Sequence, residues 1–196
     1  MPFIEVIEIG PDTVGGWLGD IDSHLPARHP FRDKDKVTWA HEATRGVNHR
    51  IRSENPEPNG YYLLRDLGFT LPASGVRLSD LARAVPTTKR GPYYNTYLEH
   101  DGRGDAFCVL DELHCFIHGA LVGRQLDLIE RYRGSFAMAE ELYYYATVLK
   151  TLVGSEFEGL EELLTRASHS IDLLRPRMNY ETKLEHGEEN GHPYSI

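Results

Sequence analysis

The sequence predicts a mainly α-helical fold with a small β component, built as one domain. Apolar residues recur at three- and four-residue spacing over several long stretches after residue 35, and short Pro- and Gly-containing segments such as "NPEPNG" separate these stretches. The 196 residues, 40% of them hydrophobic, suffice for one core without disulfides. We expect this domain to cover residues 1–178 and residues 179–196 to form a polar, flexible tail.

Charge and hydropathy exclude several classes of protein. A net charge of −9 argues against a nucleic-acid-binding surface, which needs clustered Lys and Arg. No run of 18 apolar residues occurs, so we expect no membrane span, and "MPFIEVIEIG" lacks the basic region of a secretory signal. These features favour a cytoplasmic protein, and they do not indicate an oligomeric state.

The N-terminal third is expected to contain a strand, a loop and a long helix. "PFIEVIEIG" alternates loosely and predicts a short strand, and residues 10–35, rich in Gly, Pro, Asp and His, predict a loop. Residues 35–53 predict a helix that "NPEPNG" ends, with His41 on its apolar face. The other residues of that face are Val37, Ala40, Thr44, Val47 and Ile51.

The remaining chain reads as one more strand and several helices. "GYYLLRDLGFTLP" predicts a strand, and "LSDLARAVP" predicts a short helix with Ser79 as its N-cap and Pro86 at its end. Residues 106–123 are mostly apolar and predict a buried helix, and two or three further helices follow. If Cys108 and Cys115 share that helix, their α-carbons are about 10 Å apart, too far for a disulfide, so both should be reduced.

The predicted helix over residues 35–53 carries an incomplete zinc-protease motif. In H-E-x-x-H, two histidines bind the metal and the glutamate acts as general base. His41 and Glu42 match the first half of this motif, but Arg45 takes the place of the second histidine. Positions 41, 45 and 48 lie on one side of the helix. Because His-Glu dipeptides are common, a half-buried histidine beside a surface glutamate is an equally simple interpretation.

A second group of chemically active residues lies in the predicted buried helix. "VLDELHCFIHGA" places Asp111, Glu112, His114, Cys115 and His118 within eight residues. Such groups are costly to bury unless they are paired or bind a metal. His114 and His118 have the i, i+4 spacing that allows two histidines to share a metal. The alternative is that Glu112 pairs with an arginine and that the histidines are satisfied core residues.

Four segments together resemble a known family. "WAHEATRGVNHRIR", "GYYLL", "AVPTTKRGPYYNTYL" and "LDELHCFIHGA" are similar in order and spacing to segments of bacterial zincin-like proteins, the gluzincin and anthrax-lethal-factor-like metallopeptidases. The resemblance covers about residues 37–123. It implies a zincin-like single domain with several buried helices, a zinc cofactor, and hydrolysis of a peptide or amide bond.

The resemblance also implies roles for individual residues. His41 and Glu112 correspond to zinc ligands and Glu42 to the base that activates water, while Tyr94 or Tyr97 would steady an oxyanion. The chain departs from the family pattern at Arg45, at Cys115 and at His118.

Arg45 makes zinc binding doubtful. A guanidinium stays protonated and has no lone pair to give to a metal. It can instead form a charge-assisted pair with Glu112. We therefore expect the two helices to pack together, with His41, Arg45 and Glu112 in one pocket. Any bound metal would need a replacement ligand, for which His118, His114 and His49 are the candidates.

Three functions stay open at this stage. The first is a divergent metal-dependent hydrolase in which Glu42 is the base, His41, Glu112 and His118 bind zinc, and Arg45 and Tyr97 assist catalysis. In that interpretation Tyr94 and His114 contact a peptide or small-molecule substrate. The second is an enzyme that has lost the metal and uses His41, Glu42 and Arg45 for another reaction. The third is a non-catalytic binding protein, or pseudoenzyme.

Overall fold

The computed structural model describes residues 16–26, 33–99, 104–154 and 157–185. In this part of the chain the fold is mainly helical with one small sheet, which confirms the predicted fold class. The predicted strand in "PFIEVIEIG" lies outside the described residues. The helices and strands are α1 (Gly16–Ser23), α2 (Lys36–Glu54), β1 (Asn59–Tyr62), β2 (Gly68–Leu71), α3 (Leu78–Ala84), the 3₁₀ helix η1 (Thr87–Lys89), the π-helix η2 (Asn95–Glu99), α4 (Cys108–Gln125), α5 (Ile129–Val153) and α6 (Glu158–Glu185).

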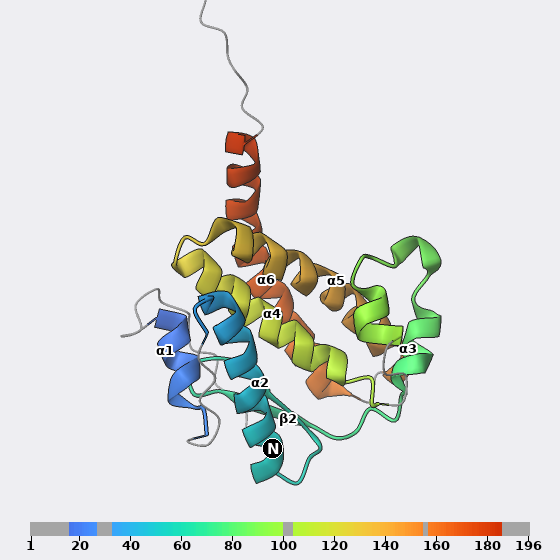
Figure 1. The fold of residues 1–196 in the computed structure, drawn as a ribbon. Helices are drawn as coiled ribbons and strands as arrows, with labels where there is room; N and C mark the ends of the chain where they lie inside the picture. Colours follow the sequence, from blue (N-terminus) through green and yellow to red (C-terminus); the bar gives the residue numbers. More distant parts are fainter. Residues whose placement is uncertain (1–15, 27–32, 100–103, 155–156, 186–196) are drawn as a thin grey trace, which may run out of the picture.

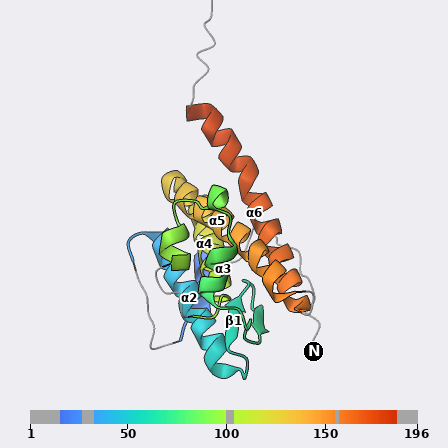
Figure 2. The ribbon, with the colours of Figure 1, turned by 90° about the vertical axis from the view of Figure 1, so that its right-hand side faces the viewer.

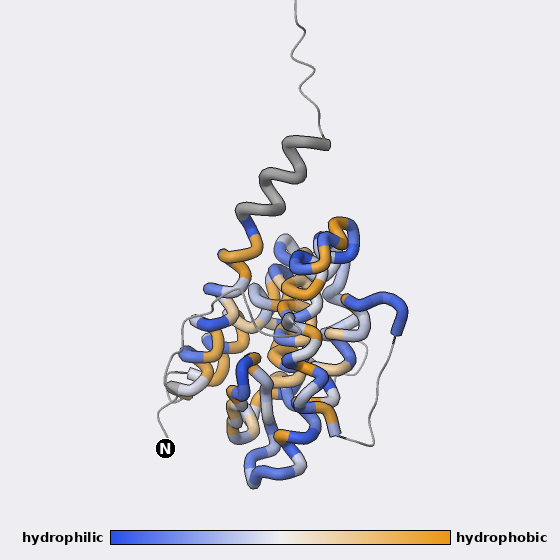
Figure 3. Tube along the Cα trace, turned by 90° about the vertical axis from the view of Figure 1, so that its left-hand side faces the viewer, coloured by the Kyte–Doolittle hydropathy of each residue, from blue (hydrophilic) through white to orange (hydrophobic). Residues whose placement is uncertain are grey.

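Helix α4 lies at the centre of the molecule. It packs against α2 on one side and α5 on the other, and α6 packs against α5 and α4 (Figure 1). The C-terminal end of α6 extends beyond the packed helices (Figure 2). Hydrophobic segments run along the inner faces of the helices, whereas hydrophilic segments gather at the outer turns (Figure 3). This arrangement buries most of α4, as its apolar sequence predicts.

Two hydrophobic cores stabilise the described part. The larger one joins α3, α4, α5, α6 and the hairpin, with fully buried Leu113 and Leu142 among its residues. The smaller one joins α1, α2 and β1, with Ile21 and Ala40 fully buried. Cys108 and Cys115 both lie in α4 and are not bridged, as their spacing predicts.

The sheet is an antiparallel hairpin of two strands, whereas the sequence predicted one strand in this segment. Asn59 pairs with Leu71 and Tyr62 pairs with Gly68. Tyr61, in β1, is 1% exposed, and its hydroxyl donates to the carbonyl of Phe107 at 3.2 Å. The hairpin is therefore attached to the start of α4.

Helix α1 corrects the expected loop over residues 10–35. Its residues have no strong helical pattern of their own, and tertiary contacts hold them in place. The Asp22 carboxylate accepts a hydrogen bond from the Trp39 indole of α2 at 2.8 Å. The Asp20 carboxylate accepts one from the Tyr62 hydroxyl of β1 at 3.0 Å. Such contacts between distant segments cannot be read from local spacing.

Two helix ends also differ from expectation. Helix α3 begins two residues earlier than predicted, so Arg77 and not Ser79 is its N-cap, and the Asp80 side chain accepts from the Arg77 backbone N–H at 3.4 Å. Its end at Ala84, just before Pro86, agrees with the prediction. Helix α6 continues to Glu185, seven residues into the segment expected to be a flexible tail. None of the described helices is both long and apolar enough to cross a membrane.

Candidate functional site

Helix α2 carries three of the predicted site residues, with His41 and Arg45 on the side that faces α4 and Glu42 at the edge of that side. Its N-terminus is capped by the Asp35 carboxylate, which accepts from the Val37 backbone N–H at 3.1 Å. The apolar stripe of α2 packs on α4, which confirms the expected contact between these helices. One turn separates His41 from Arg45, and Glu42 lies beside them towards solvent.

Arg45 contacts three other side chains, and we call the four residues His41, Glu42, Arg45 and Glu112 the Arg45 cluster. Arg45 Nη2 donates to Glu112 Oε1 at 2.7 Å and lies 3.0 Å from His41 Nε2. Its Nη1 donates to Glu42 Oε2 at 3.0 Å and to Glu42 Oε1 at 3.3 Å. The predicted convergence of His41, Arg45 and Glu112 is therefore confirmed, and so is the pairing of Arg45 with an acid.

His41 is held as a neutral ring. Because a guanidinium only donates hydrogen bonds, His41 Nε2 must accept from Arg45, which leaves the ring proton on Nδ1. The His41 side chain is 10% exposed. Burial, assisted by the positive charge of Arg45, lowers the pKa of His41 to about 4. Nδ1 is buried and has no hydrogen-bond partner among the described residues.

Glu112 has one bound and one unbound oxygen. Burial raises the pKa of its carboxyl group, although the charge of Arg45 acts in the opposite direction. Oε1 accepts from Arg45, whereas Oε2 is buried and makes no hydrogen bond with the described part of the protein. The distance from Glu112 Oε2 to His41 Nε2 is 3.6 Å. Burial therefore makes Glu112 easier to protonate than an exposed glutamate.

Two aromatic rings form an apolar wall beside the cluster. The Phe116 ring of α4 lies 4.3 Å from the His41 ring, measured between centroids, and the Tyr97 ring packs edge-on against Phe116 at 5.9 Å. Tyr97 belongs to the π-helix η2, a conformation frequent at functional sites. Burial, together with the charge of Glu112, raises the pKa of Tyr97 to about 12, so the hydroxyl remains a donor.

His114 and His118 are buried in α4 but do not belong to the cluster. His114 Nδ1 is 2.7 Å from the Leu110 carbonyl, and His118 Nδ1 is 3.0 Å from the Thr44 hydroxyl. At 100° per residue, His118 lies about 120° around α4 from Glu112. Within the described residues His118 therefore forms no three-ligand group with His41 and Glu112, its role as a metal ligand stays a prediction, and His49 is exposed on α2.

The hydroxyl of Tyr94 is engaged away from the cluster. It donates to the Ala82 carbonyl of α3 at 2.8 Å, and its ring is 4% exposed. Tyr94 therefore anchors the segment before η2 in the core. The predicted substrate contacts of Tyr94 and His114 receive no support from this geometry, because both side chains make intramolecular hydrogen bonds and are buried.

Sequence reasoning missed a second polar network beside the cluster. The Asp111 carboxylate accepts from Asn48 Nδ2 at 2.6 Å and from Arg52 Nη1 at 3.2 Å. Asn48 Oδ1 in turn accepts from the Tyr62 backbone N–H at 2.6 Å. This network fixes α2, α4 and β1 relative to each other. The signal for it was the position of Asn48 on the same side of the helix as His41 and Arg45.

The residues at this site do not fit a zinc ion. Within the described ranges, no group of three or more His, Cys, Asp or Glu side chains could hold a metal. Arg45 Nη2 contacts the two atoms, His41 Nε2 and Glu112 Oε1, that a metal would have to share. The site thus offers two possible zinc ligands, His41 and Glu112, beside the positive charge of Arg45, whereas a zinc site uses three or four protein ligands.

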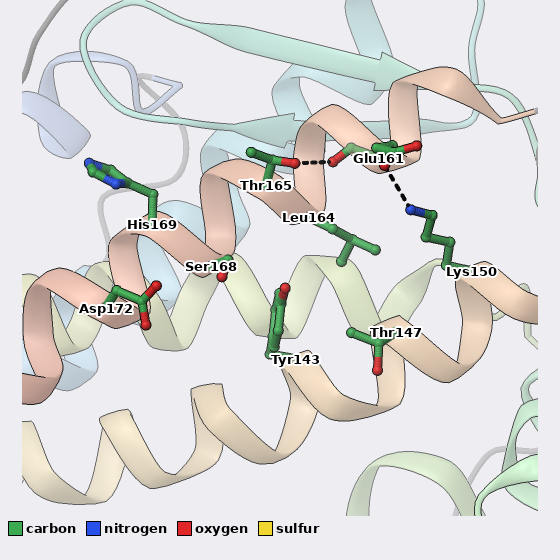
Figure 4. Close-up of a pocket in the computed structure, with 9 residues that line it drawn as sticks. All are labelled: Tyr143, Thr147, Lys150, Glu161, Leu164, Thr165, Ser168, His169 and Asp172. Carbon is green, nitrogen blue, oxygen red and sulfur yellow. Dashed lines mark hydrogen bonds and ion pairs between the residues drawn. The ribbon is translucent and has the colours of Figure 1, made fainter.

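A groove of about 380 Å³ lies elsewhere, between α5 and α6 (Figure 4). None of the predicted site residues lines it. Its main charged contact is internal, since Lys150 Nζ lies 3.1 Å from Glu161 Oε1. The groove is lined by Tyr143, Thr147, Lys150, Glu161, Leu164, Thr165, Ser168, His169 and Asp172. The Arg45 cluster is therefore the better candidate for chemistry, because burial shifts the pKa values of His41 and Glu112 and because Glu112 has one unbound carboxylate oxygen.

Comparisons with known proteins leave the family open. No model of a protein family matches the chain, and no curated protein or solved structure matches it significantly. The resemblance to zincin-like metallopeptidases therefore stays a prediction, and the function has to be argued from the site itself.

Proposed function

We propose that the chain is a metal-independent enzyme that moves protons to and from a small molecule or a peptide at the Arg45 cluster. The observation that supports this most strongly is the position of the guanidinium. Arg45 Nη2 contacts both His41 Nε2, at 3.0 Å, and Glu112 Oε1, at 2.7 Å. The positive charge that a metal would supply is thus replaced by one that belongs to the chain.

Electrostatics favours this proposal over a metal-dependent hydrolase. A divalent ion about 5 Å from a guanidinium is repelled by roughly 6–7 kcal/mol at an effective dielectric constant of 20, before relaxation. Binding a metal between His41 and Glu112 would require Arg45 Nη2 to leave both His41 Nε2 and Glu112 Oε1. Burial, assisted by the positive charge of Arg45, already lowers the pKa of His41 and keeps its ring neutral.

The four groups suit general acid–base chemistry. The Glu42 side chain is 32% exposed and can take a proton at the solvent side of the cluster, from the attacking water in a hydrolysis or from the substrate itself. Arg45 stabilises negative charge that develops on a substrate oxygen, and the Tyr97 hydroxyl can donate to the same oxygen. Glu112, whose pKa is raised by burial, is suited to return a proton as general acid. Hydrolysis of a peptide or amide bond is the first reaction to test.

Glu42→Gln is expected to lower turnover at least about a hundredfold with little effect on folding, because it removes the base and almost no volume. Substrates would be sought by ligand-observed NMR with a library of small amides and peptides, with a chelator present throughout. Turnover of each bound compound would then be followed with the natural chain and the variant.

Glu54→Gln is the matched control, since Glu54 lies on the same helix and pairs with Arg50 at the surface. This variant should retain full turnover. Full turnover by Glu42→Gln, or turnover that requires added zinc and disappears with the chelator, would refute the proposed function.

A further inference from the structure

The segment that leads to Tyr97 is fastened to α5 by one carboxylate. We call residues 90–99 the strap. Glu141 Oε1, on α5, accepts from the Tyr93 backbone N–H at 3.0 Å and from the Tyr145 hydroxyl. The Tyr145 hydroxyl accepts from the Gly91 backbone N–H at 3.2 Å. Two backbone donors of the strap are thus satisfied by Glu141 and its partner Tyr145.

Gly91 allows the strap to approach this carboxylate closely. A Cβ at position 91 would lie 2.1 Å from Glu141 Oε2, a distance that no side chain tolerates without a shift of the carboxylate. The strap is also fixed on its other side. The Tyr94 hydroxyl donates to the Ala82 carbonyl of α3, and within the strap the Arg90 guanidinium lies 4.3 Å from the centre of the Tyr94 ring. Contacts to α3 and α5 therefore determine where the strap runs.

A continuous series of contacts connects Glu141 to the Arg45 cluster. The Tyr97 backbone N–H donates to the Tyr93 carbonyl at 3.1 Å. Tyr93, which is bound to Glu141, therefore positions Tyr97. The Tyr97 ring packs edge-on against Phe116, and Phe116 packs against His41. A displacement of Tyr93 would therefore move the Tyr97 ring relative to Phe116.

We propose that Glu141 is a positioning residue that fastens the strap to α5 and thereby fixes the Tyr97 ring against the Arg45 cluster. It acts through the backbone of the strap. The importance of Tyr97 for a substrate rests on the proposed function above, but its position can be measured without any substrate.

The test compares the Tyr97–Phe116 ring contact and the exchange rate of the Tyr93 amide by NMR at pH 7. In Glu141→Ala the ring contact should be lost, and Tyr93 amide exchange should accelerate at least about tenfold, as expected for the loss of one charge-assisted hydrogen bond. Glu141→Gln keeps an acceptor for this amide and should restore most of the natural behaviour. Glu140→Ala, which removes the neighbouring partner of Arg175, should change neither signal.

Gly91→Ala provides an independent perturbation, because it displaces the carboxylate without removing it. Its effect on Tyr97 should have the same direction as that of Glu141→Ala, and the double variant should show no larger effect than Glu141→Ala alone. An intact Tyr97–Phe116 contact in folded Glu141→Ala and Gly91→Ala would overturn the proposal, and so would an equal loss in Glu140→Ala. If Glu141→Ala does not fold, the comparison is made between Gly91→Ala, which should lose the Tyr97–Phe116 contact, and Glu141→Gln, which should keep it. Failure to find a substrate would count against the proposed function and leave these signals unaffected.

Discussion

Replacing Arg45 with histidine is expected to raise the zinc affinity of the site at least about a hundredfold. The substitution removes the guanidinium and supplies an imidazole one turn from His41, beside Glu112. The repulsion removed is roughly 6–7 kcal/mol before relaxation. If less than half of that is realised, about 3 kcal/mol, the affinity still changes a hundredfold. Isothermal titration of zinc into the natural chain and the variant measures the difference.

Two control variants distinguish the effect of removing the Arg45 charge on zinc affinity from the effect of adding an imidazole ligand. Arg45→Gln removes the charge without adding an imidazole and should give a much smaller gain. Arg50→His places an imidazole on the same helix at an arginine that pairs with Glu54, and it should give no gain. An unchanged zinc affinity in Arg45→His would show that His41 and Glu112 are not arranged around a position that a metal can occupy.

Acidification from pH 6.5 to 4 is expected to lower the free energy of unfolding by several kcal/mol. His41, His114 and His118 are buried, and burial is the largest cause of the lowered pKa of each. In the unfolded chain these rings titrate near pH 6.5. Between the two pKa values the unfolded state binds more protons, so stability is fully present above pH 6.5 and is lost as the pH falls.

The contribution of His41 gives the order of magnitude of this loss in the free energy of unfolding. Its pKa falls from 6.5 to about 4, which corresponds to about 3 kcal/mol at 1.36 kcal/mol per pKa unit. Glu112 acts in the opposite direction because its pKa is raised, so Glu112→Gln should make the loss on acidification steeper.

Urea unfolding at several pH values between 4 and 7 measures this dependence. His41→Gln, whose amide oxygen can still accept from Arg45, should flatten it. His169→Gln, at an exposed position on α6, is the control and should leave it unchanged. A free energy of unfolding that does not change from pH 6.5 to 4.5 in the natural chain would contradict the burial of neutral histidines.

The parts of the site that lie on regular helices could be predicted from the sequence. The spacing of apolar residues located α2 and α4 closely. The presence of His41 and Glu112 on apolar faces then implied that the two helices meet there. The cost of burying unpaired charge implied that Arg45 would pair with Glu112, and it does.

The remaining features depend on contacts that local patterns do not contain. The strap is rich in tyrosine, and its π-helical turn changes which ring faces inward, so spacing could not distinguish Tyr94 from Tyr97. The hydrogen bond between His118 and Thr44 satisfies a ring that spacing alone suggested for a metal. The fastening of the strap by Glu141 depends on residues 48 positions apart.

Nitrogen-15 NMR of the His41 ring, recorded between pH 5 and 8 with and without one equivalent of zinc, tests the central claim most directly. If Arg45 takes the place of a metal, Nε2 is unprotonated and accepts a hydrogen bond, Nδ1 carries the proton, and zinc changes neither signal. A His41 Nε2 signal that shifts to a metal-bound value on addition of one equivalent of zinc would contradict the metal-independent site.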